Sequence, residues 1–481
     1  MSKRIVVVGA GVGGLATAAR LSKDSHIVEV LEKLSCCGGR NNIIEDKGFR
    51  FDTGPSFVMM PDLFEELFSY CGENIKDYLD LRALDPSYKI FYPDGDMLTV
   101  HKDSNRTKEE LERIEPGSGI KFDAFIKEVT RIYNEIRPLL WKCFTPWTMA
   151  NPRYWPLVTK IRAFDSYWGL AKRFFKSEKL SYAFTFEAMF MGVSPFETPA
   201  FYSVISYADH VQKIFHPMGG MYKVPLALES LGRKFGAKYR YNCEVTNIKR
   251  AGDSFLLDVR DRQIEAENLV INADYAYAKT DLLKCHIPKY KYSCSVYLLY
   301  LGLKTKISGL AHHNLFFAQD LKKNLNQIFK DKSLSFDPSF YVHVPTVTDP
   351  SLAPEGKDIL YILVPVPNLQ ENKEDVSVNE DKIRSIVFDK INRRLGINLE
   401  DLIEVEHRFY PQDFVSRYNI KYGATFGLAH NLMQSAFLRP INFDRKYKNL
   451  YFVGASTQPG GGLPVVIAGS KIVADLINRG R

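Results

Sequence analysis

The chain has 481 residues, more than one hydrophobic core usually organises, so we expect two or three domains. Hydrophobic residues make up 45% and charged residues 25%, which is typical of a folded globular protein and excludes a disordered or collagen-like chain. The formal net charge is +8 at pH 7, and we expect no nucleic-acid partner. No window reaches the roughly 18 uninterrupted apolar residues of a membrane span, so the sequence predicts a protein that does not cross a bilayer.

The N-terminal residues predict a βαβ unit. Arg4 to Val8 is a run dominated by β-branched residues, typical of a parallel strand buried on both faces. A glycine-rich turn breaks this run, and Leu15 to Leu21 then has a helical composition. His26 to Leu31 returns to strand-type residues and leads into Glu32.

The turn inside this unit carries the spacing G-x-G-x-x-G of dinucleotide-binding proteins. The predicted loop comprises Gly9, Ala10, Gly11, Gly13 and Gly14. Gly11 lets a pyrophosphate approach the backbone at the helix N-terminus, where free N–H groups and the helix dipole favour negative charge. Glu32 is placed to accept hydrogen bonds from the adenosine ribose.

A second glycine turn favours FAD over a nicotinamide cofactor. Gly39 and Arg40 follow Glu32 closely enough for the guanidinium to reach the same diphosphate, an element that a nicotinamide fold does not need. The alternative interpretation of Arg40 is a solvated cation in a turn.

Cysteine and histidine spacing predicts no metal site. The seven cysteines are odd in number and lack C-x-x-C or paired zinc spacing, which favours a reduced cytosolic interior. Cys36 and Cys37 are adjacent, and we expect two small residues in a turn rather than a strained vicinal disulfide. His312 and His313, without acids at ligand spacing, predict a surface turn.

A longer pattern resembles a known family. Phe51 to Ser56, followed by Val58 to Pro61, resembles the F-D-x-G-P segment that follows G-G-R in the phytoene desaturase family of FAD-dependent carotenoid desaturases. The resemblance covers nearly the whole chain and is nearest to the bacterial dehydrosqualene (diapophytoene) desaturases. It continues at Ile114–Ser118, Gly219–Tyr222, Tyr292–Ser295, Leu352–Lys357 and Ala455–Gly460. Gln458 stands where the family usually has His, and 460–462 reads Gly-Gly-Gly in place of the usual Gly-Ala-Gly; these departures bear on substrate choice or the number of desaturation steps.

This resemblance implies further cofactor-binding residues. In similar flavoproteins the residue matching Val245 contacts adenine through its backbone, and a C-terminal glycine turn donates N–H groups to the flavin-side phosphate and ring. Here a strand-like run, Asn449 to Val453, and a helical stretch, Val465 to Leu476, flank that turn. The implied residues are Gly54, Pro55, Val245, Gly454, Gly462 and Leu463.

The expected fold is α/β: a glutathione-reductase-like FAD-binding Rossmann domain with an inserted α+β substrate domain and a helical membrane-associating segment. The flavin domain is discontinuous, over residues 1–100, 215–285 and 435–481. Residues 101–214 form a mostly helical substrate and membrane-docking segment, and 286–434 a mixed-sheet substrate domain that walls a chamber. Ile383, Ile386, Val387 and Ile391 fall at the spacing of a core-facing helix.

The implied chemistry removes two hydrogens from adjacent carbons of an apolar polyene, with hydride passing to oxidised flavin. Such a site aligns the substrate and excludes water, and it needs no charged nucleophile. No catalytic residue is assigned, because each acid or histidine near the expected chamber wall also has a structural interpretation. These residues are Glu187, Asp209, His210 and His216.

Three alternatives remain open at this stage. A carotenoid oxygenase or isomerase would share all of these motifs. A flavin-dependent amine oxidase would share the nucleotide motifs but would need an aromatic cage, where the C-terminal turn offers Gly, Pro and Ala. A non-catalytic flavin-binding or membrane scaffold is the third. The sequence does not separate a thirty- from a forty-carbon substrate, or oxygen from a quinone as electron acceptor.

One segment predicts attachment to a membrane surface. The four tryptophans, Trp141, Trp147, Trp155 and Trp168, fall within 28 residues. Residues 137–180 hold nine basic and two acidic residues, a net +7, interleaved with further aromatic rings. Amphipathic rings beside cations favour a bilayer interface with anionic lipid. We therefore expect a peripheral, monotopic protein on the cytoplasmic face of a membrane; the alternative is that these aromatics form a helical core or line a substrate tunnel.

Overall fold

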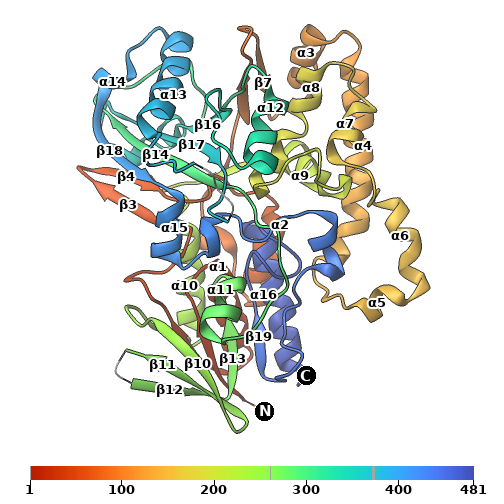
Figure 1. Cartoon of the computed structure of the whole chain (residues 1–481), viewed down its shortest axis with the longest axis vertical. Helices are drawn as coiled ribbons and strands as arrows, with labels where there is room; N and C mark the ends of the chain where they lie inside the picture. The colour runs from red at the N-terminus through yellow and green to blue at the C-terminus, as the bar shows by residue number, and fades with distance from the viewer. Residues whose placement is uncertain (1, 261, 371–373, 481) are drawn as a thin grey trace.

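The computed structural model describes residues 2–260, 262–370 and 374–480. A five-stranded parallel sheet, in the order β19-β13-β1-β2-β9, lies at the end of the molecule that carries both termini (Figure 1). Its strands are β1 (Arg4–Val8), β2 (Ile27–Leu31), β9 (Lys238–Arg240), β13 (Asn268–Ile271) and β19 (Leu450–Phe452). The sheet therefore joins three stretches that are far apart in the sequence.

Each face of this sheet has its own cover. Ile5 and Val7 of β1 pack with the helices α1 (Val12–Lys23), α10 (Lys223–Lys234) and α16 (Leu463–Asn478). Val6 and Val8 face the antiparallel sheet of β10 (Val245–Ala251), β11 (Ser254–Val259) and β12 (Arg262–Ala266). Because Ile5 to Val8 alternate between two buried faces, this part of β1 is apolar without interruption.

The second large sheet of the molecule is mixed and has seven strands, in the order β18-β14-β17-β16-β15-β6-β7. Its strands are β6 (Tyr88–Phe91), β7 (Met97–Val100), β14 (Ser295–Leu303), β15 (His313–Phe316), β16 (Phe340–His343), β17 (Asp358–Val366) and β18 (Ile403–Phe409). The helix α13 (Glu380–Leu395) covers one face through Ile383, Val387 and Ile391, which confirms the predicted core-facing helix. The first stretch of the flavin domain was expected to end at residue 100. The strand pairing does not follow that boundary, because β6 pairs with β15 and so belongs to the mixed sheet.

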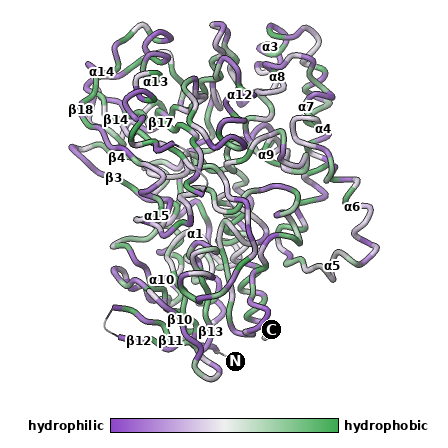
Figure 2. The backbone as a smooth tube through the Cα atoms, in the orientation of Figure 1, coloured by the Kyte–Doolittle hydropathy of each residue, from purple (hydrophilic) through white to green (hydrophobic). Residues whose placement is uncertain are grey.

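Helices dominate the stretch between residues 104 and 207. They are α3 (Ser104–Ile114), α4 (Ser118–Ile136), α5 (Pro146–Ala150), α6 (Trp155–Lys160), α7 (Tyr167–Lys172), α8 (Glu178–Ala183) and α9 (Val204–Tyr207). The loop with α5 and α6 projects from the body (Figure 1), and its hydropathy is mixed along its length (Figure 2). Among the helices of the described ranges, none combines the length and the apolar character needed to cross a membrane.

Shorter elements complete the chain. They are β3 (Ile43–Asp46), β4 (Phe49–Asp52), α2 (Pro61–Tyr70), β5 (Leu81–Ala83), β8 (Phe215–Pro217), α11 (Tyr275–Tyr277), α12 (Leu321–Asn326), α14 (Leu399–Leu402) and α15 (Pro411–Tyr418).

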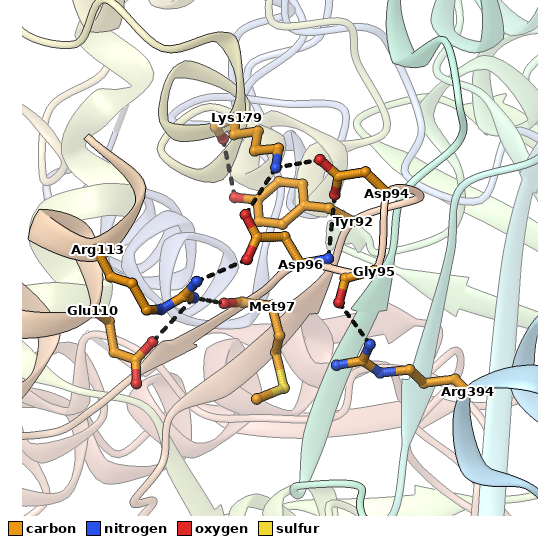
Figure 3. Close-up of polar contacts among 9 residues, drawn as sticks. All are labelled: Tyr92, Asp94, Gly95, Asp96, Met97, Glu110, Arg113, Lys179 and Arg394. Atoms are coloured by element: carbon orange, nitrogen blue, oxygen red, sulfur yellow. Dashed lines mark hydrogen bonds and ion pairs between the residues drawn. The ribbon is translucent and has the colours of Figure 1, made fainter.

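Ion pairs fasten the helices to the turn between β6 and β7 (Figure 3). Lys179 pairs with Asp94 and Asp96, and Arg113 pairs with Asp96 at 2.7 Å. Arg394 of α13 donates to the Gly95 carbonyl at 2.8 Å. Each exposed pair contributes about 0 to 1 kcal/mol, so their main effect is to set the relative position of these elements.

The same kind of pairing neutralises much of the positive segment seen in the sequence. Five of its nine basic side chains form ion pairs with acidic side chains, and most of these acids lie outside residues 137–180. The pairs are Arg137 with Asp62, Lys160 with Glu135, Arg162 with Glu128, Arg173 with Asp165, and Lys179 with Asp94 and Asp96. The local charge is therefore smaller than the count over residues 137–180 suggests.

Candidate functional site

One cavity of about 1000 Å³ runs from the glycine turns of the parallel sheet to the projecting loop. At the first end it is lined by Gly9, Gly11, Gly13, Glu32, Arg40, Gly54, Val245, Gly454 and Gly462. At the other end its walls come from α6 and from residues 432–438. A volume of this size suits a large cofactor and an elongated ligand together.

The glycines of the first turn are required by close packing. A Cβ at Gly14 would lie 2.1 Å from the Gly9 carbonyl oxygen, and a Cβ at Gly11 would lie 2.8 Å from Nδ2 of Asn272. Asn272 follows β13 and donates from Nδ2 to the Gly9 carbonyl at 3.3 Å. Asn272 was not among the predicted site residues, although it lines the cavity, because only the β1–β13 pairing brings it to this turn.

Glu32 organises the same turn. Its buried carboxylate accepts hydrogen bonds from the backbone N–H of Ala10 at 2.7 Å and of Leu34 at 2.8 Å. Burial raises the pKa of Glu32, and these N–H donors oppose that rise. Ala10 and Gly14 do not line the cavity: Ala10 holds Glu32 and Gly14 permits the helix to approach the strand.

The second glycine turn lies directly on the first. Gly38 donates to the Ala10 carbonyl at 2.8 Å, and a Cβ at Gly39 would lie 3.3 Å from the Gly11 Cα. Arg40 reaches the cavity, where its Nη1 donates to the Thr425 carbonyl at 2.6 Å. Burial lowers the pKa of Arg40, and the charge of Asp274 opposes that shift. Arg40 is therefore not a solvated turn cation.

Further predicted residues meet at this end of the cavity. Gly54 and Pro55 line it beside Arg40, and a Cβ at Gly54 would lie 2.0 Å from the Arg40 carbonyl oxygen. Val245 lines it at the start of β10.

The C-terminal turn supplies a second helix N-terminus. Gly454 ends the β19 segment with φ +141°, and Gly462 precedes α16 with φ +99°. Leu463 begins α16 and, like both glycines, lines the cavity. Neither α1 nor α16 has a side-chain cap at its N-terminus, so both present backbone N–H groups to a ligand.

Three buried residues near this turn make contacts that the sequence did not predict, although Gln458 was already noted as a departure from the family pattern. Arg439 donates to the backbone carbonyls of the 428–434 and 455–457 segments, including Ala455 at 2.5 Å. Nε2 of His430 accepts from the Gly461 N–H at 3.0 Å, and burial lowers the pKa of His430 so that the ring is neutral. Gln458 bonds the backbone of Phe144. These contacts span from 5 to 314 residues of sequence, and no sequence motif marks them.

The middle and far end of the cavity are apolar. Its walls include Phe57, Phe186, Phe190, Phe201 and Phe317, together with aliphatic residues such as Val204, Ile205 and Ala208. At the far end, Trp155, Phe164 and Met433 line the cavity and are also 62%, 80% and 72% exposed. The cavity therefore opens to the surface at the projecting loop, between apolar side chains.

The acids and histidines singled out in the sequence lie outside the lining. Glu187, Asp209 and His210 form one buried cluster, in which Ser206 Oγ donates to Glu187 at 2.5 Å. Burial and the Asp209 charge raise the pKa of Glu187 well above its ordinary value. His216 is buried in a second cluster elsewhere.

Two predictions about short segments can be compared with the structure. His312 and His313 do not lie in a surface turn: both are buried where β15 begins, so that expectation was wrong. The reason is that this segment enters the middle of a mixed sheet. The thiols of Cys36 and Cys37 are free, as expected for two small residues in a turn.

The glycine turns, the buried acid after β2 and the apolar chamber define a dinucleotide-cofactor oxidoreductase for an apolar substrate. The family described as flavin containing amine oxidoreductase matches residues 12–478. A zeta-carotene-forming phytoene desaturase of Myxococcus xanthus is 40% identical, covering 98% of this chain and 93% of its own. A 4,4'-diapophytoene desaturase (4,4'-diaponeurosporene-forming) of Staphylococcus aureus is 34% identical, covering 98% of both. The chain belongs to the flavin-containing amine oxidoreductase family and, within it, to the phytoene desaturase family.

Solved structures agree on the fold. An oxidoreductase of Methanosarcina mazei superposes with a TM-score of 0.65 at 18% identity, covering 97% of this chain and 98% of its own. Putrescine oxidase bound to putrescine gives a TM-score of 0.64 at 15% identity, covering 100% and 99%. The protein thus has the FAD-binding fold of the flavin amine oxidases, and its cofactor is FAD. Two uncapped helix N-termini on one cavity fit this cofactor's diphosphate.

Proposed function

We propose that this enzyme desaturates an acyclic carotenoid precursor, dehydrosqualene or phytoene, in carotenoid biosynthesis. The observation that carries the proposal is the single cavity that joins the cofactor turns to a long aromatic and aliphatic chamber. The curated relatives named phytoene desaturase and diapophytoene desaturase support the same substrate class. The likeness to putrescine oxidase concerns the fold alone.

Some residues of this chain would bind the cofactor, and others would align the substrate. FAD supplies the hydride-accepting chemistry when bound. The turns at Gly11 and Gly462 would hold its phosphates, and Arg40 would place a cation near them. The apolar walls would orient a polyene along the chamber and exclude water, which keeps a hydride-acceptor site dry. The proposed terminal electron acceptor is oxygen or a quinone.

The division of the chain follows from this proposal. Residues 1–100, 215–285 and 435–481 carry the cofactor turns. The inserts at 101–214 and 286–434 enclose the substrate, together with β6 and β7 of the first stretch, which join the mixed sheet. The chamber lining draws on both inserts, through Phe186, Phe317 and Tyr341, and also on the first stretch, through Phe57.

The projecting loop is the proposed membrane contact, on the cytoplasmic face. Trp147 is 86% exposed and lies on the same loop as Trp155 and Phe164, and Lys142 and Arg153 are exposed close by in the sequence. Rings beside cations are suited to an anionic bilayer surface. Because Trp155 and Phe164 also line the cavity opening, an apolar substrate would pass from lipid to chamber without crossing water.

Product analysis tests the reaction type. Holoenzyme is incubated in air with thirty- and forty-carbon acyclic carotenes in liposomes, and the products are separated and identified by absorbance and mass. Desaturation predicts longer conjugation with the loss of two hydrogens per step. Products that gain oxygen, or that keep their mass and change only in double-bond geometry, would instead assign a carotenoid oxygenase or isomerase.

A further inference from the structure

Three histidines that are remote in the sequence meet inside the protein. His216 belongs to β8, His312 lies just before β15, and His343 ends β16. All three are buried, and the ring nitrogens that face one another lie within 4.8 Å. The group is separate from the cavity, because none of the three lines it.

The polar contacts among these rings are incomplete. Nε2 of His312 and Nε2 of His343 lie 2.9 Å apart, a contact that a single N–H···N bond explains. Nδ1 of the buried His216 ring has no hydrogen-bond partner within the described part of the chain, and Nε2 lies 3.5 Å from the Asp349 carboxylate. Leaving a buried polar group unpaired costs about 1 to 3 kcal/mol, so something that accepts imidazole lone pairs is the simplest completion.

Neighbouring polar groups contact these histidine rings in the way that polar groups contact the histidine ligands of metal ions. Nδ1 of His312 lies 2.8 Å from the Thr348 hydroxyl, which leaves Nε2 for the centre of the group. Asp349 Oδ2 lies 3.5 Å from Nε2 of His216 and is itself held by the Gly219 N–H at 2.5 Å. Metal-bound histidines typically offer their second nitrogen to such a carboxylate or hydroxyl.

The spacing of the ring nitrogens fits a cation. Nitrogen ligands around a tetrahedral zinc ion lie about 3.4 Å apart, given Zn–N bonds of about 2.0 to 2.1 Å. The separations in this group, from 2.9 Å to at most 4.8 Å, bracket that spacing.

We propose that His216, His312 and His343 bind a divalent first-row transition metal, with Zn²⁺ as the ion that suits three imidazoles best. The ion would join β8 to the mixed sheet. β8 leads through the turn at Gly219 and Gly220 into α10, which packs on the parallel sheet of the cofactor part, whereas β15 and β16 belong to the mixed sheet of the chamber wall. The site is therefore a structural clamp between the two parts, and it does not depend on the proposed reaction.

The clamp lies directly behind the cavity wall. His313, next to His312, contacts the Phe57 ring at 5.4 Å between centroids, and its Nδ1 lies 2.6 Å from the Tyr341 hydroxyl. Phe57 and Tyr341 both line the cavity. Loss of the ion would thus loosen the wall without removing any lining side chain.

Metal content tests the proposal. Tag-free holoenzyme is equilibrated with a small excess of ZnCl₂, dialysed in metal-free buffer, and analysed for zinc and for flavin per chain. We expect one zinc per chain in the wild type and none in His216→Gln or His343→Gln. His313→Gln is the matched control, since it is equally buried and adjacent but lies outside the group; it should keep its zinc.

Two outcomes would overturn the proposal: wild-type protein that holds no zinc, or equal zinc in the wild type and in both variants. Flavin content and circular dichroism report whether each variant folds. Should the variants fail to fold, Co²⁺ added to wild-type holoenzyme decides the matter. Visible d–d bands of tetrahedral cobalt at longer wavelength than the flavin band are expected, and their absence rejects the site.

Discussion

The side-chain amide of Gln458 is bonded in both directions to the backbone of Phe144. Oε1 of Gln458 accepts from the Phe144 N–H at 2.7 Å, and Nε2 donates to the Phe144 carbonyl at 2.8 Å. Nε2 also contacts the Arg439 carbonyl at 3.2 Å. Gln458 therefore anchors the base of the projecting loop to the C-terminal cofactor turn, so the position where the family usually has His has a structural role here.

Removing this anchor should loosen the loop. Gln458→Ala leaves the buried Phe144 N–H without its acceptor, which costs about 1 to 3 kcal/mol. We expect a lower free energy of unfolding and faster proteolysis within residues 145–165, measured by denaturant titration and limited proteolysis. Gln412→Ala, an exposed glutamine, is the control. Cleavage of Gln458→Ala at the wild-type rate would show that the loop is held by other contacts.

A bulky residue at Gly11 should abolish flavin retention. The new side chain would meet Asn272 and fill the space in front of the α1 N-terminus. Purified Gly11→Val should be colourless, whereas Thr246→Val, an exposed change in the same part of the fold, should keep a full complement of flavin. Flavin absorbance per chain is the measurement, and a yellow Gly11→Val protein would contradict the assignment of this turn.

Stability should fall as pH rises through the acid range because of Asp52. Burial raises the pKa of Asp52 to about 6 from its ordinary 3.8, against the N–H groups of Met221 and Tyr222. The folded state thus holds a proton that the unfolded state has lost, and the free energy of unfolding drops by about 2 to 3 kcal/mol between roughly pH 4 and pH 6. Asp52→Asn should lack this drop.

The measurement is urea unfolding at a series of pH values. Only the difference between the wild type and Asp52→Asn is used, since other groups titrate in the same range. Asp80→Asn, which changes an exposed carboxylate, should keep the wild-type slope. Parallel curves for the wild type and Asp52→Asn would refute the role of Asp52.

Membrane binding should depend on the exposed rings of the projecting loop. Replacing Trp147, Trp155 and Phe164 by Ser should abolish sedimentation with anionic liposomes and leave the free energy of unfolding nearly unchanged, because these side chains are exposed. Ser at Ile120 and Val378, exposed apolar positions elsewhere, serves as the control.

A second variant tests whether membrane binding depends on basic side chains rather than on the exposed aromatic rings. Glu at Lys172, Arg173 and Lys176 alters the basic patch that the sequence alone suggests, but Arg173 already pairs with Asp165. We expect only a modest loss of binding. Full binding by the Ser variant together with no binding by this Glu variant would move the membrane contact to the end of α7 and the segment that follows it.

The sequence predicted what depends on neighbours in the chain. The β1–α1–β2 unit follows from local composition, and its glycine spacing placed Gly11 and Glu32 correctly on the cavity. Arg40 was found because its turn lies close to that unit. The resemblance to a family added Val245 and Gly462, which no local pattern distinguishes.

Contacts that depend on strand pairing between distant segments could not be predicted from the sequence. Asn272 reaches the first turn only through the β1–β13 register, and His343 reaches His312 only through the β15–β16 pairing. The net charge of +7 over residues 137–180 is partly neutralised by acids from distant segments, such as Asp94 and Asp62, and the sequence does not show this pairing. Burial of His312 and His313 likewise follows from where a strand sits in its sheet.

The central claim is that an acyclic carotene reduces the flavin of this enzyme. Flavin-loaded protein is mixed anaerobically with a thirty- or forty-carbon acyclic carotene in liposomes, and flavin and polyene absorbance are followed together. The account predicts flavin bleaching that keeps pace with the growth of polyene absorbance, with no bleaching by an amine such as putrescine. Bleaching by the amine, with neither carotene reducing the flavin, would contradict it.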